Sequence, residues 1–353
     1  MDYKKKLEDL INEMDSRGGS DLHFNCGLPP SIRVDGDLAF LTEHEILKST
    51  DIENFLLILL TEKGGEAFHL THDLDFAYLS NNSVRLRGNA YIEKGQPAIA
   101  LRRVPKVKTI TELNLPEKIR EFALAKQGLF LIVGPIGQGK STTMAAMIEE
   151  INMGRAAHIV TIEDPVEFTF ENKKSIIDQR EVGIDTDSFE SAMKSVFRED
   201  VNVILIGEMR THETIAAAVT AAETGHLVIS TLHTNNASQS IDRIIDSFPA
   251  DQQDQIRMQL ASSLIGILSQ RLIPKMNGGR VMAYELLVST PAVANLIREK
   301  RTHELPMLIE TGTDHGMVDM NRVLIDLVQR DVIALGSAIE YSPNPNALRS
   351  QFK

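Results

Sequence analysis

The chain has 353 residues, a length that favours two domains, and its 42% hydrophobic and 24% charged residues are typical of globular proteins. Its apolar runs stay well below the roughly 18 residues that a membrane span requires. The formal net charge of −12 argues against a general nucleic-acid binder. Cys26 is the only cysteine, which excludes a disulfide framework and a four-thiolate zinc site within one chain.

The first hundred residues read as a small α/β domain. In MDYKKKLEDLINEM the apolar residues recur at helical spacing among charges, which predicts an amphipathic helix to about Ser16 rather than a signal peptide, and hence a cytoplasmic protein. Turn signals at 80–83 and 93–96 lie between β-prone runs and predict two hairpins. We therefore expect an N-terminal domain over 1–104, followed by a proline-containing linker over 105–116.

From residue 117 onward, strand and helix patterns alternate, which predicts a mostly parallel sheet covered on both faces. The expected strands are 129–133, 157–163, 202–207 and 226–232, and the expected helices between them are 140–152, 188–199 and 212–224. After Asn236 the pattern turns largely helical, over 237–247, 251–271, 291–299 and 318–330. The second domain is thus expected over 117–335, with a disordered tail over 336–353 because YSPNPNALRSQFK is polar and broken by prolines.

A phosphate-binding loop lies between the first of these strands and its helix. The segment GPIGQGKS matches G-x-x-x-x-G-K-[ST], in which glycines let several backbone N–H groups point into one concavity at a helix N-terminus. Lys140 would reach the β- and γ-phosphates, and the Ser141 hydroxyl would ligate Mg²⁺. The alternative is a structural glycine turn between strand and helix that binds no ligand. The candidate nucleotide-binding residues are Gly134, Pro135, Ile136, Gly137, Gln138, Gly139, Lys140, Ser141 and Thr142.

Carboxylates follow two of the expected strands. HIVTIEDPVEF ends its apolar run at Glu163, with Glu167 four residues further on, and VNVILIGEMR ends at Glu208, where many P-loop proteins hold Mg²⁺ with an acidic residue. The carboxyl ends of parallel strands share one edge of the sheet, so these groups are expected beside the loop. A guanine-selective Asn-Lys-x-Asp element is absent from the sequence, which favours ATP.

Two histidines flank the last strand, in GHLVISTLHT. Their odd spacing places His226 and His233 on opposite faces, so they are not expected to ligate one metal. One of them could contact the γ-phosphate from the strand end, and the alternative for each is a structural role.

Taken together, several motifs resemble the motor ATPases of the secretion superfamily, and specifically the type IV pilus retraction ATPases of the PilT/PilU type. The resemblance covers about residues 20–328 and implies a PAS-like N-terminal domain, a RecA-like ATPase domain and a ring-shaped homohexamer with ATP at the subunit boundaries. The motifs that carry it, in chain order, are GPIGQGKSTT, TIEDPVEF, DQREVGIDTDSFESAMKSVFRED, VILIGEMR, TAAETGHLVISTLHT and IDRIIDSFPADQQDQIR.

The resemblance also implies roles for individual residues. Glu167 is the expected catalytic base in preference to Glu163, Glu208 matches the acidic position that binds Mg²⁺, and His226 and His233 match the histidine box. Arg210 follows in VILIGEMR and is counted among the candidate catalytic residues. The family also uses basic positions of the N-terminal domain toward the nucleotide, which here are Arg85, Arg87, Arg102 and Arg103; the alternative for each is a solvated strand charge.

The chain departs from the family pattern at three positions. Ile136 and Gln138 replace a usual threonine and serine of the loop, and neither side chain is needed for the phosphate contacts. Ala294 stands where retraction motors carry the first arginine of an A-I-R-x-L-I-R-E-type segment, whereas Arg298 is retained. Because that segment is associated with retraction rather than hydrolysis, this departure bears on the direction or partner of the motor.

The resemblance implies a cytoplasmic motor at the inner face of the inner membrane, docked on a pilus platform protein and working with or without a paralogous motor ATPase. Three alternatives remain open. A pilus-assembly or type II secretion ATPase generally carries a four-cysteine zinc insertion and a longer N-terminal region, and the single cysteine and short N-terminus of this sequence argue against it. A hexameric DNA translocase is disfavoured by the acidic charge. A regulatory nucleotide-binding accessory subunit would hydrolyse ATP slowly.

Overall fold

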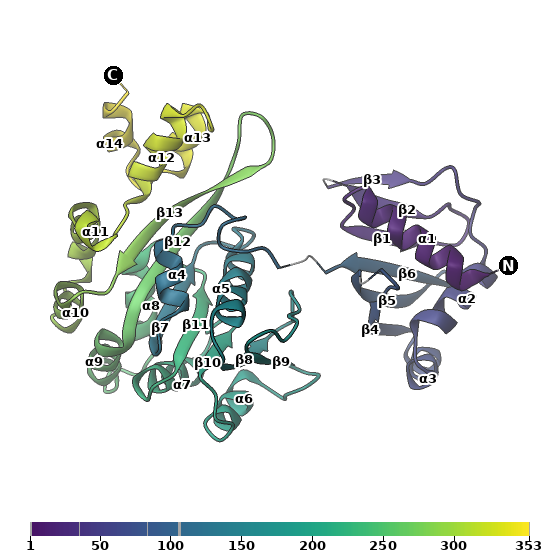
Figure 1. The fold of residues 1–353 in the computed structure, drawn as a ribbon, viewed down its shortest axis with the longest axis horizontal. Helices are drawn as coiled ribbons and strands as arrows, with labels where there is room; N and C mark the ends of the chain where they lie inside the picture. Colours follow the sequence, from purple (N-terminus) through teal and green to yellow (C-terminus); the bar gives the residue numbers. More distant parts are fainter. Residues whose placement is uncertain (1, 35, 83, 105–106, 353) are drawn as a thin grey trace. The chain divides into compact units, whose positions relative to one another are not determined.

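The computed structural model describes residues 2–34, 36–82, 84–104 and 107–352. The chain forms two compact units, unit 1 over Met1–Lys106 and unit 2 over Val107–Lys353 (Figure 1). Within the described residues, no helix has both the length and the apolar character needed to cross a bilayer.

Unit 1 is an antiparallel sheet covered by helices on one face. Its described strands pair in the order β3-β2-β1-β6-β5-β4. They are β1 Asp21–Phe24, β2 Ser31–Val34, β3 Asp37–Phe40, β4 Asp73–Leu79, β5 Arg85–Glu93 and β6 Gln96–Arg103. The helices are α1 Tyr3–Ser16, α2 Ser49–Leu59 and α3 Glu62–Thr71. The core lies between the sheet and the helices, where Leu22, Phe24 and Phe55 are fully buried.

The sequence predicted the beginning of this unit well. The amphipathic helix ends at Ser16, and the two expected hairpins are the antiparallel pairs β4–β5 and β5–β6. The turn of the first hairpin includes Ser83, which lies outside the described residues.

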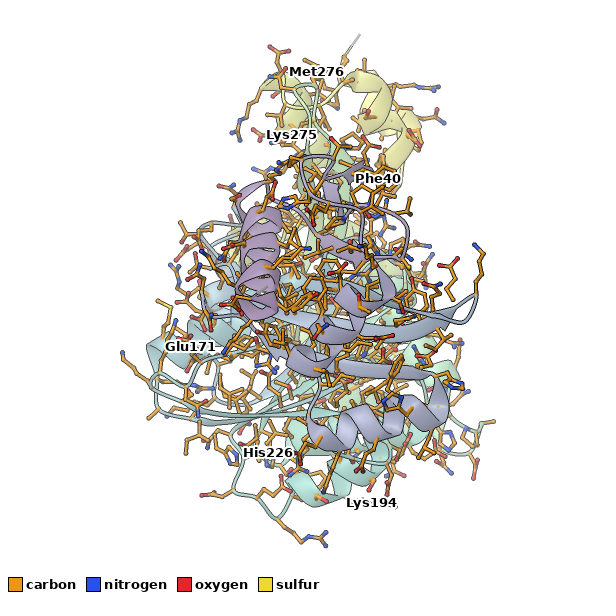
Figure 2. All side chains as sticks on the ribbon, turned by 90° about the vertical axis from the view of Figure 1, so that its right-hand side faces the viewer. Phe40, Glu171, Lys194, His226, Lys275 and Met276 are labelled. Atoms are coloured by element: carbon orange, nitrogen blue, oxygen red, sulfur yellow. The ribbon has the colours of Figure 1, made fainter. Side chains whose placement is uncertain are left out.

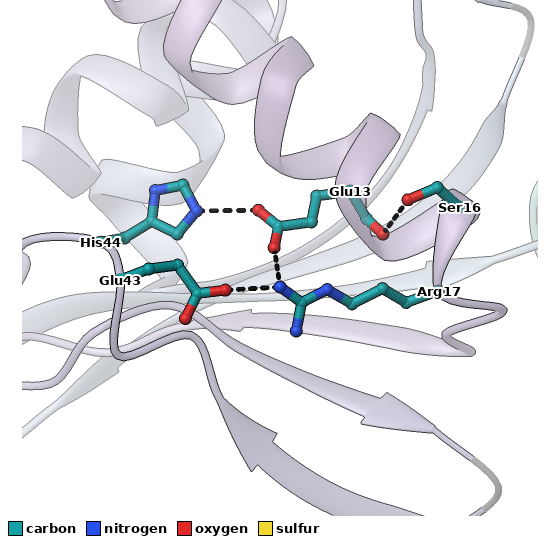
Figure 3. A network of polar contacts seen from close by, with 5 residues as sticks. All are labelled: Glu13, Ser16, Arg17, Glu43 and His44. Atoms are coloured by element: carbon teal, nitrogen blue, oxygen red, sulfur yellow. Dashed lines mark hydrogen bonds and ion pairs between the residues drawn. The ribbon is translucent and has the colours of Figure 1, made fainter.

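A network of polar side chains ties the end of α1 to the segment before α2 (Figure 3). His44 Nε2 lies 2.8 Å from Glu13 Oε2, and the guanidinium of Arg17 bridges the carboxylates of Glu13 and Glu43. These side chains are partly or fully exposed, so the network adds little stability beyond fixing the path of the segment.

Unit 2 is built on a seven-stranded sheet in the order β13-β12-β7-β11-β10-β8-β9. All neighbouring strands are parallel except β12 and β13, which form an antiparallel hairpin. The strands are β7 Gly128–Val133, β8 His158–Glu163, β9 Ile176–Glu181, β10 Val203–Ile206, β11 Leu227–Leu232, β12 Leu264–Pro274 and β13 Arg280–Val288. The expected mostly parallel sheet is confirmed.

Helices cover both faces of this sheet. One core cluster joins it to α4 Lys118–Ala123 and α5 Lys140–Gly154. On the other face lie α6 Phe189–Val196, α7 His212–Glu223, α8 Ala237–Asp246, α9 Gln253–Ser263, α10 Pro291–Arg298 and α11 Leu305–Thr311. The short helix η1 Thr302–Glu304 lies between α10 and α11, and after α11 come η2 Thr313–His315, α12 Met320–Gln329, α13 Leu335–Tyr341 and α14 Pro345–Ser350.

The expected helix over 251–271 is half wrong. Helix α9 ends at Ser263, and the following residues form β12, which pairs with both β7 and β13. The cause is tertiary: LIGILSQRLI is an apolar run whose period does not distinguish a buried strand from a helix. Gly266 allows close packing there, because a Cβ at that position would lie 2.9 Å from the Phe122 ring. Strand β9 was also missed, since it is short and half polar.

The expected linker and tail also differ from the structure. Residues 105–106 lie outside the described residues, but the rest of the expected linker belongs to unit 2, where Ile110 and Leu115 enter the core. The tail forms α13 and α14 instead of being disordered. Ala338 and Leu348, both fully buried, pack with α12 against the outer half of the β12–β13 hairpin, and this burial offsets the entropic cost of ordering a polar, proline-broken segment.

We predict that Leu348→Ala lowers the free energy of unfolding by about 2–4 kcal/mol, because it opens a cavity in this cluster. Leu335→Ala, at a partly exposed leucine of the same segment, is the matched control and should cost less than about 1 kcal/mol. The chain has no tryptophan, so urea unfolding is followed by circular dichroism. Equal, small effects of the two substitutions would show that the tail does not pack on the hairpin.

Candidate functional site

The phosphate-binding loop connects β7 to α5. Strand β7 is buried along its whole length and ends at Val133, and α5 begins at Lys140. Gly137 and Gly139 have φ values of +77° and +80°, in the left-handed region that favours glycine. At Gly134 a Cβ would lie 2.6 Å from the carbonyl oxygen of Gln270. The glycines of the motif are therefore required by the backbone path and by the strand behind it.

Lys140 is held at the centre of the loop, with its side chain largely buried. Its Nζ donates to the carbonyl oxygens of the first two loop residues, at 2.8 and 3.0 Å, and lies 3.2 Å from His233 Nδ1. Burial lowers the pKa of Lys140, while the nearby carboxylates of Glu208 and Glu167 oppose that shift. A cation held between carboxylates at a helix N-terminus is suited to meet the charge of a polyphosphate.

The loop lines a cavity of about 450 Å³. The cavity brings together most of the residues that the sequence predicted, contributed by the loop and by the ends of β8, β10 and β11. Those lining it are Ile136, Gly137, Gln138, Gly139, Lys140, Ser141, Thr142, Glu163, Glu167, Glu208, Arg210 and His233.

Glu208 and His233 form a polar chain with Lys140. Glu208 follows β10, its carboxylate pairs with the guanidinium of Arg210, and its Oε2 lies 3.4 Å from His233 Nε2. A neutral imidazole protonated at Nε2 satisfies both neighbours, because Nδ1 then accepts from the Lys140 ammonium and Nε2–H points to the carboxylate. The start of α5 and the ends of β10 and β11 are thus linked through one imidazole.

The glutamate that ends β8 and the one four residues further on differ in their surroundings. Glu163 Oε1 accepts hydrogen bonds from Thr161 Oγ1 at 2.7 Å and from Gln179 Nε2 at 3.4 Å, the latter from β9. Burial raises the pKa of Glu163, which these hydrogen bonds only partly counter. Glu167 is exposed on the cavity wall. An exposed carboxylate can turn toward a water molecule, which favours Glu167 over the fixed Glu163 as the base.

The structure does not bring His226 to this cavity. It precedes β11, whereas His233 follows it, so the two lie at opposite ends of a strand, roughly 20 Å apart. His226 Nδ1 is 3.0 Å from Ala221 O, and its ring packs edge-on against Phe197. In Figure 2, His226 lies low in the view, far from Lys275 and Met276 of the β12–β13 hairpin at the top. Within one chain its contacts are structural.

The four candidate arginines belong to unit 1. Arg85 is exposed, and Arg87 lies opposite Arg102 in the β5–β6 register. Arg102 Nε is 2.8 Å from Asp21 Oδ1, and Arg103 Nε is 2.8 Å from Asp15 Oδ1. Their role toward the nucleotide remains a prediction.

Strands β12 and β13 contribute site residues that the sequence reasoning missed. Leu272 and Arg280 line the cavity, and Arg280 Nη1 approaches Gly137 O at 3.5 Å. Gln270 contacts the loop from behind. Assigning 251–271 to a helix concealed Gln270, and Leu272 and Arg280 were missed because no strand was expected after residue 271. The polar pair Gln270-Arg271 within an apolar run was the available signal.

The model of the type II/IV secretion system protein family matches residues 108–319. The chain belongs to this family. It is 41% identical over 340 residues to the type IV pilus retraction ATPase PilT of Pseudomonas aeruginosa, covering 96% of this chain and 98% of that one. It is 39% identical over 350 residues to the type IV pilus ATPase PilU of the same organism, covering 99% and 91%. A crystal structure of the pilus retraction motor PilT with bound ADP superposes with a TM-score of 0.88 at 42% identity, covering 97% of this chain and 98% of that one. The resemblance stated from the motifs and the expected fold class are confirmed.

We predict that Glu163→Gln changes how stability depends on pH. The folded state holds the Glu163 proton more tightly than the unfolded state, so stability is fullest below the unfolded pKa of about 4.3 and falls as pH rises through the raised folded pKa. Glutamine keeps the hydrogen bonds from Thr161 and Gln179 but cannot ionise. The variant should therefore gain stability relative to the wild type as pH rises.

Urea unfolding across about pH 4 to pH 8 checks this. Glu171→Gln, at an exposed glutamate outside the cavity lining (labelled in Figure 2), controls for the loss of one negative charge. Parallel pH curves for wild type and Glu163→Gln would contradict the raised pKa.

Proposed function

We propose that the protein is a hexameric, ATP-hydrolysing motor that drives retraction of type IV pili. The observation that carries the proposal is the cavity that gathers Lys140, Ser141, Glu167, Glu208 and His233 at the carboxyl ends of neighbouring strands. The identity with PilT along almost the whole chain supports the biological assignment.

The cavity contains the groups that phosphoryl transfer to water needs. The loop N–H groups and Lys140 would hold the phosphates and balance their charge, and Glu167 would orient the attacking water and accept its proton. The Ser141 hydroxyl and the Glu208 carboxylate are oxygen donors of the kind that Mg²⁺ prefers, and they would hold the ion, which neutralises phosphate charge when bound. His233, which contacts both Lys140 and Glu208, would couple the presence of the γ-phosphate to the position of the Glu208 carboxylate.

Mechanical work needs a part that moves with the nucleotide. We infer that the arginines Arg85, Arg87, Arg102 and Arg103 of unit 1 act toward ATP at a subunit boundary of the ring. A guanidinium from a separate unit couples its approach to stabilisation of charge in the transition state. The motor would act in the cytoplasm at the inner membrane, docked on a pilus platform protein.

A second candidate is an accessory motor that assists a paralogous retraction ATPase. The observation that favours it is Ala294, which stands where the resemblance places the first arginine of the retraction-associated segment and is buried in the core where α10 packs on α9. An accessory motor would share the cavity and its chemistry, so the two candidates are separated in cells rather than by the geometry of the site.

We predict that purified protein hydrolyses ATP with a specific activity that rises with protein concentration as subunits assemble. Lys140→Ala should lower kcat/KM at least about 100-fold, and Glu167→Gln should lower kcat about 100- to 10,000-fold while still binding ATP. Glu171→Gln is the control. If the assembled wild type binds ATP but does not turn it over, the motor proposal fails in its simple form.

We predict that the gene restores pilus-dependent surface motility to a strain that lacks its retraction motor, and that the Glu167→Gln form does not. Motility is scored as colony spreading, with pilus number counted in parallel. Restoration only when a paralogous motor is present would favour the accessory role instead.

A further inference from the structure

Strand β12 continues past the end of β7 and runs behind the phosphate-binding loop. The parallel register between the two strands ends at Ser269 opposite Val133, after which β7 gives way to the loop. Strand β12 goes on to Pro274, still paired with β13. Its residues 270–272 therefore lie against the loop instead of against β7.

One side chain of this stretch contacts both the loop and the helix that follows it. Gln270 is almost fully buried; its Nε2 donates to Gln138 O at 2.5 Å, and its Oε1 accepts from Thr143 Oγ1 at 3.0 Å. The first contact fixes the loop, and the second fixes the first turn of α5. A carboxamide is suited to this position because it offers a donor and an acceptor without charge.

Gln138 adds a second hydrogen bond between the loop and β12, and we call the two bonds made by Gln270 and Gln138 the clamp. Its Oε1 accepts from the backbone N–H of Leu272 at 2.5 Å. The carboxamide of Gln138 thus gives this loop a direct bond to the backbone of β12. Gln138 and Gln270 thus join the same two segments by reciprocal hydrogen bonds, one to each backbone.

We propose that Gln270 is a positioning residue for nucleotide binding, acting through the loop backbone with Gln138 as its partner. The loop contains three glycines with positive φ, which would otherwise sample many conformations. Fixing it before the nucleotide arrives lowers the entropy lost on binding. The inference rests on the assignment of the cavity as the ATP site and does not depend on pilus retraction.

The test uses the full chain with ADP as the probe. Gln270→Leu removes both hydrogen-bonding groups at similar volume, and we expect it to raise the Kd for ADP and the KM for ATP about tenfold, with kcat changed less than about threefold. Gln270→Glu keeps the acceptor for Thr143 but loses the donor to Gln138 O, so it should also bind ADP more weakly. Calorimetry gives Kd, and steady-state assays give KM and kcat.

Ser269→Ala is the matched control. Ser269 is buried in the same strand, but its hydroxyl donates to Glu285 Oε1 at 3.0 Å, away from the loop. We expect this variant to lower the melting temperature and to leave the Kd for ADP unchanged. If Gln270→Leu also lowers only the melting temperature, Gln270 is structural and the proposal is wrong.

Two milder substitutions keep the proposal testable if Gln270→Leu does not fold. Gln138→Ala removes the bond to Leu272 N–H, and Thr143→Val removes one hydroxyl at nearly constant shape; each should weaken ADP binding about threefold or more. Unchanged binding in both would overturn the clamp. Loss of binding in Lys140→Ala, together with full binding in the Gln270 and Gln138 variants, would reject the clamp while keeping the ATP site. A wild type that binds no ADP would reject both.

Discussion

The structure depends on one constraint, which is that the loop after β7 must present unpaired backbone N–H groups to a phosphate while remaining fixed in position. Such a loop cannot be stabilised by its own hydrogen bonds, since those would occupy the donors it offers. Its support therefore comes from neighbours: a fully buried β7 before it, α5 after it and β12 behind it. Close contact with β12 leaves no room for a side chain at Gly134.

The same constraint explains the arrangement of charges. A positive loop at a helix N-terminus with a buried lysine needs carboxylates nearby, and Glu208 and Glu167 fill that need while opposing the depression of the Lys140 pKa. His233 stands between Lys140 and Glu208, so displacement of the lysine toward a phosphate changes what the imidazole and the carboxylate face. Nucleotide binding at Lys140 would thus change the contacts of His233 and Glu208, at the ends of β11 and β10.

The sequence predicted those parts of the structure that local rules determine. The loop, β7, α5 and the carboxylates after β8 and β10 follow from a motif and from the shared edge of parallel strands. Local rules failed where tertiary packing decides. The run LIGILSQRLI becomes a strand because β7 has an open edge, and the tail orders because Leu348 finds a hydrophobic cluster. His226 was placed in the site by resemblance, although a strand separates it from His233.

The arginines of unit 1 differ in how easily they could turn to another anion. Arg102 is exposed, but its partner Asp21 is largely buried. Burial alone would raise the pKa of Asp21, but the hydrogen bonds from Arg102 and Ser20 outweigh burial, so the pKa of Asp21 is lowered. Withdrawing Arg102 would leave a buried carboxylate with less compensation, at a cost above that of a surface pair. Arg103 and Asp15 are both about one-third exposed, so exchanging that pair costs little. On electrostatic grounds, Arg103 could leave Asp15 for a phosphate at a lower cost than Arg102 could leave Asp21.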